Sequence, residues 1–207
     1  MARDTRSIVK MSRREGYALH PKAHKALVKR GGVMPGQNPN GRGMRNKPSQ
    51  YSLQLREKQK VKRLYGLLEK QFSNLMKEAS RKQGEAGQVL LQLLEQRLDN
   101  ADYREGFATS RRAARQLVTH GHFTLNGTRV DIPSIRVKAG DVIVAREHAT
   151  KTEYFKKLDD VSPAPSTVPE WLKVNRKKFE VQVSSVPTRE EAEPDINEQL
   201  IVEYYSR

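Results

Sequence analysis

The dipeptide Asn126-Gly127 is the feature that most restricts what this chain can fold into. It lies between two short runs of alternating apolar and polar residues, 123–125 and 128–130, and favours the two-residue turn of an antiparallel hairpin. Just before the hairpin, Ser110 is placed to cap a short helix that would end at Gly121. A helix followed at once by a hairpin predicts an α+β fold for this part of the chain.

Two more alternating runs, residues 135–137 and 142–145, continue the pattern and are separated by turn-forming residues. We therefore expect a small antiparallel sheet after the helix of residues 111–119. Residues 179–186 also alternate as strands do, after a proline-rich linker.

Residues 49–104 have the spacing of helices instead. Ser49 is expected to cap the first helix, a second is expected over about 67–82, and a third over about 88–104. The cations of the first helix are expected on the side opposite its apolar residues: Arg56, Lys58, Lys60, Lys62 and Arg63.

The chain is strongly basic, and the excess is uneven. Lysine and arginine number 39 against 24 aspartates and glutamates, which gives a net charge of +15. Residues 1–50 carry 12 basic and 2 acidic side chains, whereas residues 149–207 carry 9 basic and 11 acidic ones. Such a field favours a polyanion such as nucleic acid, and a solvated basic surface without a partner is the alternative.

Residues 1–48 are expected to form a basic N-terminal extension. Within it, the run GGVMPGQNPNGRGMRNK at 31–47 has almost no apolar side chains and cannot bury enough surface to fold by itself. The segment is either a disordered tail or an extension that becomes ordered against RNA, and its charge favours the second interpretation.

No cysteine occurs, which excludes disulfides, thiol catalysis and cysteine-ligated metal sites. The first ten residues are charged and lack the apolar segment of a secretory signal. No stretch approaches the roughly 20 apolar residues that cross a bilayer. We expect a soluble intracellular protein.

Catalysis and metal binding are poorly supported. Asp99 and Asp102 could be paired catalytic carboxylates, but beside Arg97 and Arg104 they are more simply solvated ion-pair partners. The histidines form two short pairs, His20 with His24 and His120 with His122, and neither pair has an obvious third metal ligand. We expect neither an enzyme nor a cofactor.

Residues 110–129 carry the most specific pattern for RNA contact. Three arginines, Arg111, Arg112 and Arg115, lie within one turn of each other on the side of the helix opposite its apolar residues. The hairpin then presents Asn126 and Arg129. Together these groups could straddle a sugar–phosphate backbone, although they could also be ordinary exposed helix charges.

The stretch RLDNADYREGFATSRRAARQLVTHGHFTLNGTRVDIPSIRVKAGDVIVARE resembles the S-four-type RNA-binding module, which several RNA-binding proteins share. The segments YSLQLREKQKVKRLYGLLEKQF, LLQLLEQRLDN, PEWL and INEQLIVEYYSR also resemble the bacterial family of the fourth small-subunit ribosomal protein. This resemblance is in register over residues 35–207.

The resemblance implies an α+β protein in which a module at 97–158 is inserted into a helical domain made of residues 49–96 and 159–207. It also implies a primary binder of 16S ribosomal RNA that nucleates assembly of the body of the small subunit, lines the site where messenger RNA enters and contributes to translational accuracy. Its partners would be the fifth and possibly the third small-subunit proteins, in the cytoplasm of a bacterium or in a plastid.

Sequence and resemblance together predict a set of contact residues. RNA contacts are expected at Arg42, Arg45, Lys47, Arg56, Lys58, Lys60, Lys62, Arg63, Arg111, Arg112, Arg115, Gln116, His120, His122, Asn126 and Arg129. Protein contacts are expected at Glu198, Tyr204 and Tyr205.

The chain departs from the family pattern near its start. Many members carry a four-cysteine zinc knuckle there, whereas this chain has Val9, Ser12 and no cysteine, so it is similar to the zinc-free members. The PGQHG-like run of the family is also altered and reads PGQNP at 35–39.

The acidic tail is expected to avoid RNA, because carboxylates are repelled by phosphates. The acidic residues expected to point toward solvent or a basic neighbouring protein are Glu190, Glu191, Glu193, Asp195 and Glu198. The apolar and aromatic residues expected to pack on the helices of residues 51–96 are Leu200, Ile201, Val202, Tyr204 and Tyr205.

Two alternatives stay open at this point. The same module occurs in pseudouridine synthases and a tyrosyl-tRNA synthetase, but these need a catalytic domain of roughly 200 residues, for which the chain has no room. A stand-alone ribosome-associated stress or rescue factor is the better alternative, and the helices before the module and the tail after it argue against it.

Overall fold

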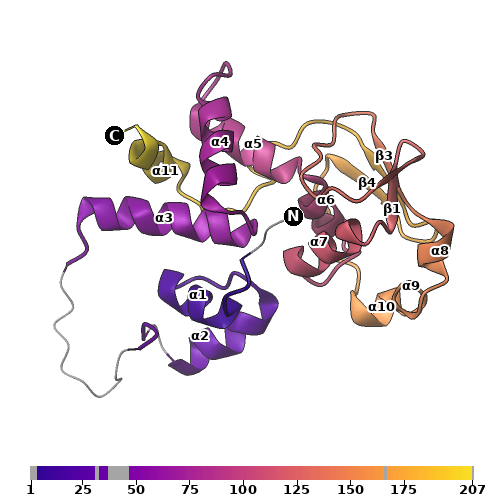
Figure 1. Ribbon diagram of the computed structural model, residues 1–207, viewed down its shortest axis with the longest axis horizontal. Coiled ribbons are helices and arrows are strands. Elements are labelled where there is room, and N and C mark those ends of the chain that lie inside the picture. Colours follow the sequence, from indigo (N-terminus) through magenta and orange to yellow (C-terminus); the bar gives the residue numbers. More distant parts are fainter. Residues whose placement is uncertain (1–3, 31–32, 37–46, 166, 207) are drawn as a thin grey trace. The chain divides into compact units, whose positions relative to one another are not determined.

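The computed structural model describes residues 4–30, 33–36, 47–165 and 167–206. The chain divides into two compact units. The helical unit comprises Met1–Val89 and Asp195–Arg207, and the sheet unit comprises Leu90–Pro194. The sheet unit is therefore inserted in the sequence between two parts of the helical unit (Figure 1). The α+β class predicted from the sequence is confirmed.

The described part of the helical unit consists of helices and connecting segments. These are α1 (Ile8–Glu15), the 3-10 turn η1 (Pro21–Ala23), α2 (His24–Arg30), α3 (Gln50–Leu64), α4 (Glu69–Ala79), the start of α5 (Ala86–Glu95) and α11 (Glu198–Tyr205). As predicted, the Ser49 side chain caps α3 by accepting a hydrogen bond from the Ser52 amide at 3.2 Å.

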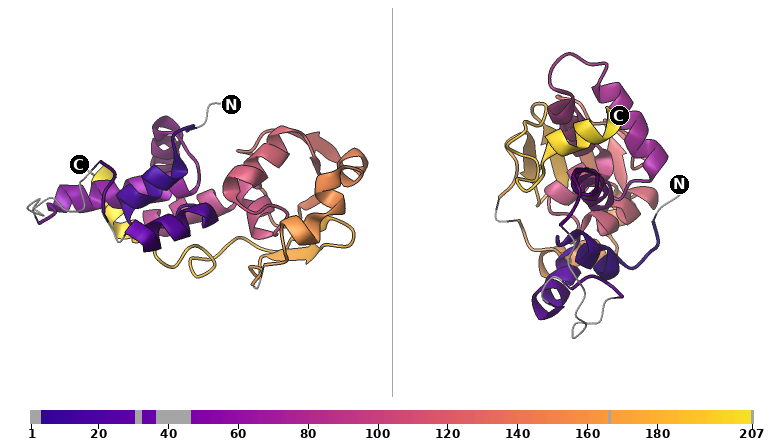
Figure 2. Two further views of the ribbon diagram at one scale, coloured as in Figure 1. Left: turned by 90° about the horizontal axis from the view of Figure 1, so that it is seen from below. Right: turned by 90° about the vertical axis from the view of Figure 1, so that its left-hand side faces the viewer.

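The last helix, α11, packs on α3 and completes the helical unit (Figures 1 and 2). Ile201 is fully buried, the Tyr204 ring lies 5.9 Å from that of Tyr51, and the Tyr205 ring lies 6.2 Å from that of Phe72. The predicted packing of the tail on the earlier helices is confirmed for these three residues. Full burial of an aliphatic side chain such as that of Ile201 is worth roughly 1.5–3 kcal/mol.

Part of the expected N-terminal extension is folded. Met11, Leu19 and Ala23 are buried, and α1 packs on α3. The prediction of an extension over residues 1–48 is therefore wrong for residues 8–30, because these apolar side chains supply a small core of their own. Most of the glycine-rich run at 31–47 lies outside the described residues.

The described part of the sheet unit holds a five-stranded antiparallel sheet in the order β2-β1-β3-β5-β4. Its strands are β1 (Phe123–Leu125), β2 (Thr128–Val130), β3 (Val142–Ala145), β4 (Leu172–Asn175) and β5 (Glu180–Val183). Its other helices are α6 (Leu98–Arg104), α7 (Arg111–Thr119), α8 (Glu147–Thr150), α9 (Glu153–Lys156) and α10 (Leu158–Val161).

The core of the sheet unit joins the helices to the sheet. Phe107 stacks on Phe123 with ring centroids 6.2 Å apart, Phe155 meets Phe123 edge-on, and Trp171 is fully buried. α7, the hairpin of β1 and β2, and β3 begin and end at the residues that the sequence predicts.

Three sequence predictions about the sheet unit need correction. The helix expected at 88–104 is split into α5 and α6, because residues 96–98 pair with the segment 135–137 instead. The Val137 amide donates to the Gln96 carbonyl at 2.9 Å, and the Leu98 amide donates to the Ile135 carbonyl at 2.8 Å. The strand expected at 135–137 is reduced to this isolated bridge.

The third correction concerns the end of the module. Residues 159–194 were expected to complete the helical domain, but β5 pairs with β3 and β4 pairs with β5. These backbone hydrogen bonds place the segment in the sheet unit, and only the residues from Asp195 onward join the helices. None of the helices in the described residues is long and apolar enough to span a bilayer.

Candidate nucleic-acid interface

Helix α7 presents one polar face on the sheet unit. The Ser110 side chain caps the helix by accepting from the Ala113 amide at 3.3 Å. Ala114 and Val118 are fully buried against the core. Arg112 and Gln116 are exposed on the other side of the helix. The capped, amphipathic character read from the sequence is confirmed.

Arg111 and Arg115 do not face solvent as predicted. Arg111 donates to Asn100 Oδ1 and to Glu193 Oε1, both at 2.8 Å, and its guanidinium lies 4.6 Å from the centre of the Tyr103 ring. Arg115 donates to Asp99 Oδ2 at 2.9 Å. Polar partners on α6 and near residue 193 cover this side of α7, so Arg112 is the exposed member of the three arginines.

Asp99 is a structural ion-pair partner and is not solvated. Arg97 clamps it with two hydrogen bonds of 3.0 and 2.8 Å, and the carboxylate is buried. Arg104 donates to Glu95 at 3.0 and 2.8 Å, and its guanidinium also lies 3.6 Å from the Glu193 carboxylate. The predicted pairing of Asp99 with Arg97 is therefore confirmed, but the prediction that this pair is solvated is wrong.

Asp102 and Glu105 form a buried acidic pair one helical turn apart. Both residues are fully buried, and none of their four carboxyl oxygens has a hydrogen-bond partner among the described residues. Burial raises the pKa of Glu105 to about 8. Burial and the nearby Glu105 and Asp99 raise the pKa of Asp102 as well. The solvated role expected for Asp102 is wrong.

The side chain of the asparagine in the hairpin turn makes hydrogen bonds within the sheet unit. Asn126 and Gly127 have φ values of 50° and 79°, as the expected turn requires. Asn126 Nδ2 donates to Asp141 Oδ1 and its Oδ1 accepts from the Val142 amide, both at 2.9 Å. Arg129, on β2, is exposed. Asn126 therefore anchors the turn to the start of β3.

The bend between α7 and β1 brings two histidines together. His120 caps the end of α7, and its ring centroid lies 6.0 Å from that of His122. His120 is exposed, whereas His122 is half-buried against the Phe155 ring, with centroids 6.1 Å apart. Among the described residues, no group of three or more His, Asp or Glu side chains is arranged to hold a metal ion.

Two of the three lysines expected on the surface of α3 are instead buried. Lys58 and Lys62 are 2% and 8% exposed and donate to Glu69 at 2.8 and 2.6 Å. Tyr205 Oη donates to the same carboxylate at 2.9 Å. Burial alone would raise the pKa of Glu69, but these three hydrogen bonds lower it to about 2.

The remaining cations of α3 also make contacts inside the helical unit. Arg56 donates to Glu15 of α1 at 3.2 Å, and Arg63 pairs with the same carboxylate. Lys60 donates to the Asp195 carbonyl at 2.6 Å. The prediction that these side chains form an open basic face is wrong, because α1, α4 and the tail supply partners for them.

Other predicted contact residues have different surroundings. Lys47 is exposed, and Arg42 and Arg45 lie outside the described residues. Exposed cations that the sequence-based set omitted lie on α1, η1 and α2: Lys10, Arg14, Lys22, Lys25 and Lys29. The high charge of residues 1–50 was the pattern that could have identified them.

The acidic tail has internal partners in the sheet unit. Glu193 accepts from Arg111, and Glu191 accepts from the Trp171 amide at 3.2 Å and from the Thr188 amide at 2.8 Å. The expectation that these two carboxylates point to solvent or to another protein is therefore wrong. They offset arginine charge and fix backbone within the sheet unit.

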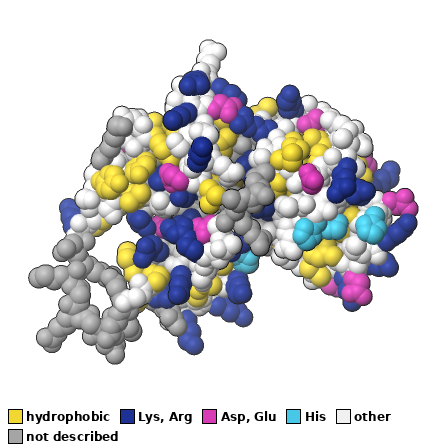
Figure 3. All heavy atoms as spheres, viewed as in Figure 1, with side chains coloured by type: hydrophobic (Ala, Val, Ile, Leu, Met, Phe, Trp, Pro, Cys, Tyr) yellow, Lys and Arg dark blue, Asp and Glu magenta, His cyan; other side chains and the backbone are white. Residues whose placement is uncertain are grey.

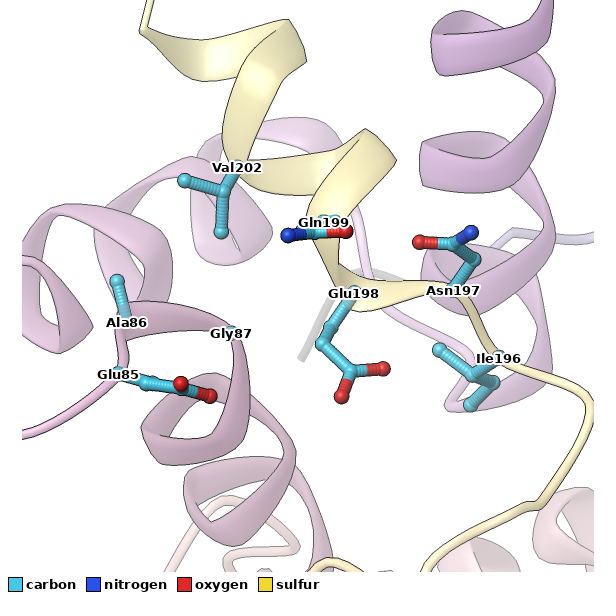
Figure 4. A pocket seen from close by; sticks show the side chains of 8 residues that line it. All are labelled: Glu85, Ala86, Gly87, Ile196, Asn197, Glu198, Gln199 and Val202. Atoms are coloured by element: carbon cyan, nitrogen blue, oxygen red, sulfur yellow. The ribbon is translucent and has the colours of Figure 1, made fainter.

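A pocket of about 600 Å³ opens between the start of α5 and the start of α11 (Figure 4). Ala86, Gly87, Ile196 and Val202 contribute apolar surface, and the Glu198 side chain points into the space between the two helices. A Cβ at Gly87 would lie 2.7 Å from Glu198 Cγ, so a glycine is needed for this close approach.

Comparison with known proteins adds an independent observation. A family model described as the ribosomal protein S4/S9 N-terminal domain matches residues 3–95, and a model described as the S4 domain matches residues 96–143. The chain is 50% identical to small ribosomal subunit protein uS4 of Clostridioides difficile, and 48% identical to the proteins of that name from Syntrophomonas wolfei and Chlorobium limicola. Each match covers 100% of both chains.

Proposed function

The chain belongs to the family of small ribosomal subunit protein uS4, and from that premise we propose that it is a structural constituent of the small ribosomal subunit that binds ribosomal RNA directly. The observation that carries this proposal is the match over the whole length of both chains to relatives of that name. A net charge of +15 and the polar outer face of α7 support it.

The RNA contacts are proposed at exposed cations and their polar neighbours. In the sheet unit these are Arg112, Gln116, His120, His122 and Arg129, and Figure 3 shows histidines and basic side chains on the same face of that unit. In the helical unit, Lys47 and the exposed cations of α1 and α2 are the corresponding groups. Arg42 and Arg45 are proposed from the sequence alone.

The buried cations are proposed to support this surface without touching RNA. Lys58, Lys62 and Arg115 would each have to leave a carboxylate partner to reach a phosphate. Breaking the buried Arg115–Asp99 pair would cost roughly 3–5 kcal/mol, which exceeds the gain from one exposed phosphate contact. Lys58 and Lys62 are themselves buried, although their partner Glu69 is 48% exposed.

The finer roles in the ribosome are proposals from the family resemblance. They are nucleation of the body of the small subunit, a position lining the site where messenger RNA enters, and a contribution to translational accuracy. The proposed partners are 16S ribosomal RNA, messenger RNA near that site, and the fifth and possibly the third small-subunit proteins, in the cytoplasm. No catalytic activity is proposed.

The protein contact is proposed at the α3–α11 face and the adjoining pocket. Tyr51 is 48% exposed and contacts Tyr204, which gives the face an aromatic surface. The pocket combines apolar side chains with the carboxylates of Glu85 and Glu198. This chemistry suits the aliphatic stem and cationic end of a lysine or arginine from a neighbouring ribosomal protein.

A stand-alone stress or rescue factor with the same module remains the second candidate function. Such a factor would require only the sheet unit and would have no use for the helical unit. The relatives match the helical unit equally, and the chain returns to complete that unit at α11. Both observations favour a ribosomal constituent.

A salt titration tests the RNA contact. With six or more phosphate contacts, the logarithm of affinity for transcribed 16S ribosomal RNA should fall by several units per logarithmic unit of salt concentration. Arg112→Ala and Arg129→Ala should each weaken binding and make the salt dependence less steep.

A matched control is Lys173→Ala, an exposed cation on β4 at the other edge of the sheet from β2. It should leave the affinity within about twofold, which is the size expected of a distant surface charge. A flat salt titration, or equal losses in the control and in Arg112→Ala, would refute a localised RNA surface on α7 and β2.

A further inference from the structure

Five cationic or titratable side chains surround the bend between α7 and β1. His120 and His122 flank Gly121, whose φ of +70° places it in the left-handed region that favours glycine. The Arg129 guanidinium lies against this glycine, because a Cβ there would be 2.9 Å from Arg129 Nε. Arg146 Nη1 donates to the Gly121 carbonyl at 3.1 Å, and His148 follows at the start of α8.

The cluster of these residues, which we call the imidazole cluster, is held by backbone hydrogen bonds. The Arg146 amide donates to the His122 carbonyl at 2.8 Å, and the Gly121 amide donates to the Val118 carbonyl at 2.8 Å. These bonds tie the end of α7, the start of β1 and the start of α8 into one rigid bend. The backbone therefore holds the Cα atoms of His120 and His122 at defined positions near the surface.

The charges that act on the His122 ring all have the same sign. Partial burial, and then the neighbouring His120, His148 and Arg146, lower the pKa of His122 below its usual range. Phe155 packs on the other side of the ring and contributes no charge. Glu147, the acidic residue next to His148, pairs with Lys151 on α8 at 2.7 Å. In the free protein, cationic neighbours therefore oppose protonation of this imidazole.

We propose that the imidazole cluster is a proton-linked binding surface for RNA phosphates, formed by His120, His122 and His148 between Arg129 and Arg146. The proposal rests on the proposed RNA-binding function and adds its regulation. A phosphate next to the cluster reverses the electrostatic environment that opposes protonation, so RNA binding and proton uptake favour each other. The protein should bind RNA more tightly as the pH falls.

The size of the effect follows from linkage. If RNA raises the pKa of one imidazole by one unit, binding is strengthened up to about tenfold at a pH below the pKa of that imidazole in the free protein. For a net rise of one pKa unit in the cluster, we expect affinity for transcribed 16S ribosomal RNA to rise several-fold, up to about tenfold, between pH 8.0 and pH 5.5 at constant salt.

The test measures affinity of the full chain across this pH range and compares two variants. In His120→Gln/His122→Gln/His148→Gln, the rise at low pH should disappear, so that the ratio of the affinity at pH 5.5 to the affinity at pH 8.0 falls to about one, whatever the affinity at pH 8.0. In His20→Gln/His24→Gln, which replaces the histidines of the helical unit, the rise should persist. Because both variants bind the same RNA, any titration of the RNA itself appears in both.

Calorimetry in two buffers of different ionisation enthalpy provides a second readout at pH 6.5. The wild-type chain should take up protons on binding, and the triple variant should not. A pH response that survives in the triple variant, or binding without proton uptake, would overturn the proposal. Absence of RNA binding at every pH would instead refute the proposed function itself.

Discussion

The buried acidic pair of Asp102 and Glu105 should make the stability of the sheet unit fall as the pH rises. A carboxylate can only accept hydrogen bonds, and none of the four oxygens has a donor in the described part of the chain. The nearby Asp99 carboxylate is also acidic and further opposes ionisation of Asp102. The folded sheet unit is therefore most stable when both of these acids are protonated.

The magnitude can be worked from Glu105. Its pKa is about 8 in the folded protein against an ordinary value of 4.5. Between these values the folded chain keeps a proton that the unfolded chain has released, so stability is highest below pH 4.5 and is lost up to pH 8. Each pH unit in this window is worth about 1.4 kcal/mol, so at pH 7 Glu105 costs roughly 3 kcal/mol.

The variant Asp102→Asn/Glu105→Gln keeps the shapes and removes the titration. At pH 8 it should be more stable than the wild-type chain by a few kcal/mol, and its stability should be nearly flat between pH 5 and 8. Urea unfolding followed by tryptophan fluorescence reports this unit, because Trp171 is the single tryptophan and is fully buried there. The exposed Asp160→Asn is the matched control and should keep the wild-type slope.

Two results would refute this reasoning. One is an unchanged pH slope in the double amide variant, which would mean that other groups dominate the linkage. The other is a variant less stable than the wild-type chain at pH 8, which would mean that the ionised acids have favourable partners in solution.

Three further predictions concern other parts of the chain. Glu69→Gln should remove stability that the wild-type helical unit has above pH 4.5 and loses as the pH falls toward 2. Because the Glu69 side chain is 48% exposed, we expect the free energy of unfolding to fall by about 1 kcal/mol, measured by circular dichroism in urea. An unchanged acid transition would contradict this prediction. Gly121→Ala should lower the free energy of unfolding of the sheet unit by roughly 1–3 kcal/mol in urea and also weaken RNA binding, because the left-handed backbone and the Arg129 guanidinium both oppose a Cβ. Gly84→Ala is the control, because Gly84 also has a positive φ, of +109°, but has room for a Cβ. It therefore measures backbone strain without displacement of Arg129. Truncation before Asp195 should increase hydrogen exchange in α3 and leave α7 protected, and equal protection of α3 in both chains would show that α11 does not stabilise it.

The predictable parts of this fold are those set by neighbouring residues. Ser49 and Ser110 cap helices, and Asn126-Gly127 forms the hairpin turn, because each of these structures depends on a few consecutive side chains. The split between α5 and α6 could not be seen locally. It depends on the pairing of Arg97 with Arg136, and in isolation the residues around Arg97 have helical spacing.

The predicted contact set failed where distant residues supply a partner. Helical spacing correctly places Arg111, Arg112 and Arg115 within one turn of each other on α7, but it does not show that partners cover Arg111 and Arg115. The partner of Arg111 at Glu193 is 82 residues away in the sequence. Lys58 and Lys62 were assigned to an exposed face for the same reason, since Glu69 lies on the next helix. Charge patterns identify the partner class better than they identify the contacting side chains.

The return of the chain at α11 also fixes an order of events during synthesis. Residues from Asp195 onward are made after the whole sheet unit, so the unit that is begun first can be completed only last. The hydrogen bond from Gln54 to Glu203 joins positions 149 residues apart, and closing so long a loop is slower than forming the local hairpin of β1 and β2. The nascent helical unit must therefore stay soluble while it is incomplete. The Glu69 carboxylate can already pair with Lys58 and Lys62 at that stage, because it is close to them in the sequence and does not need α11.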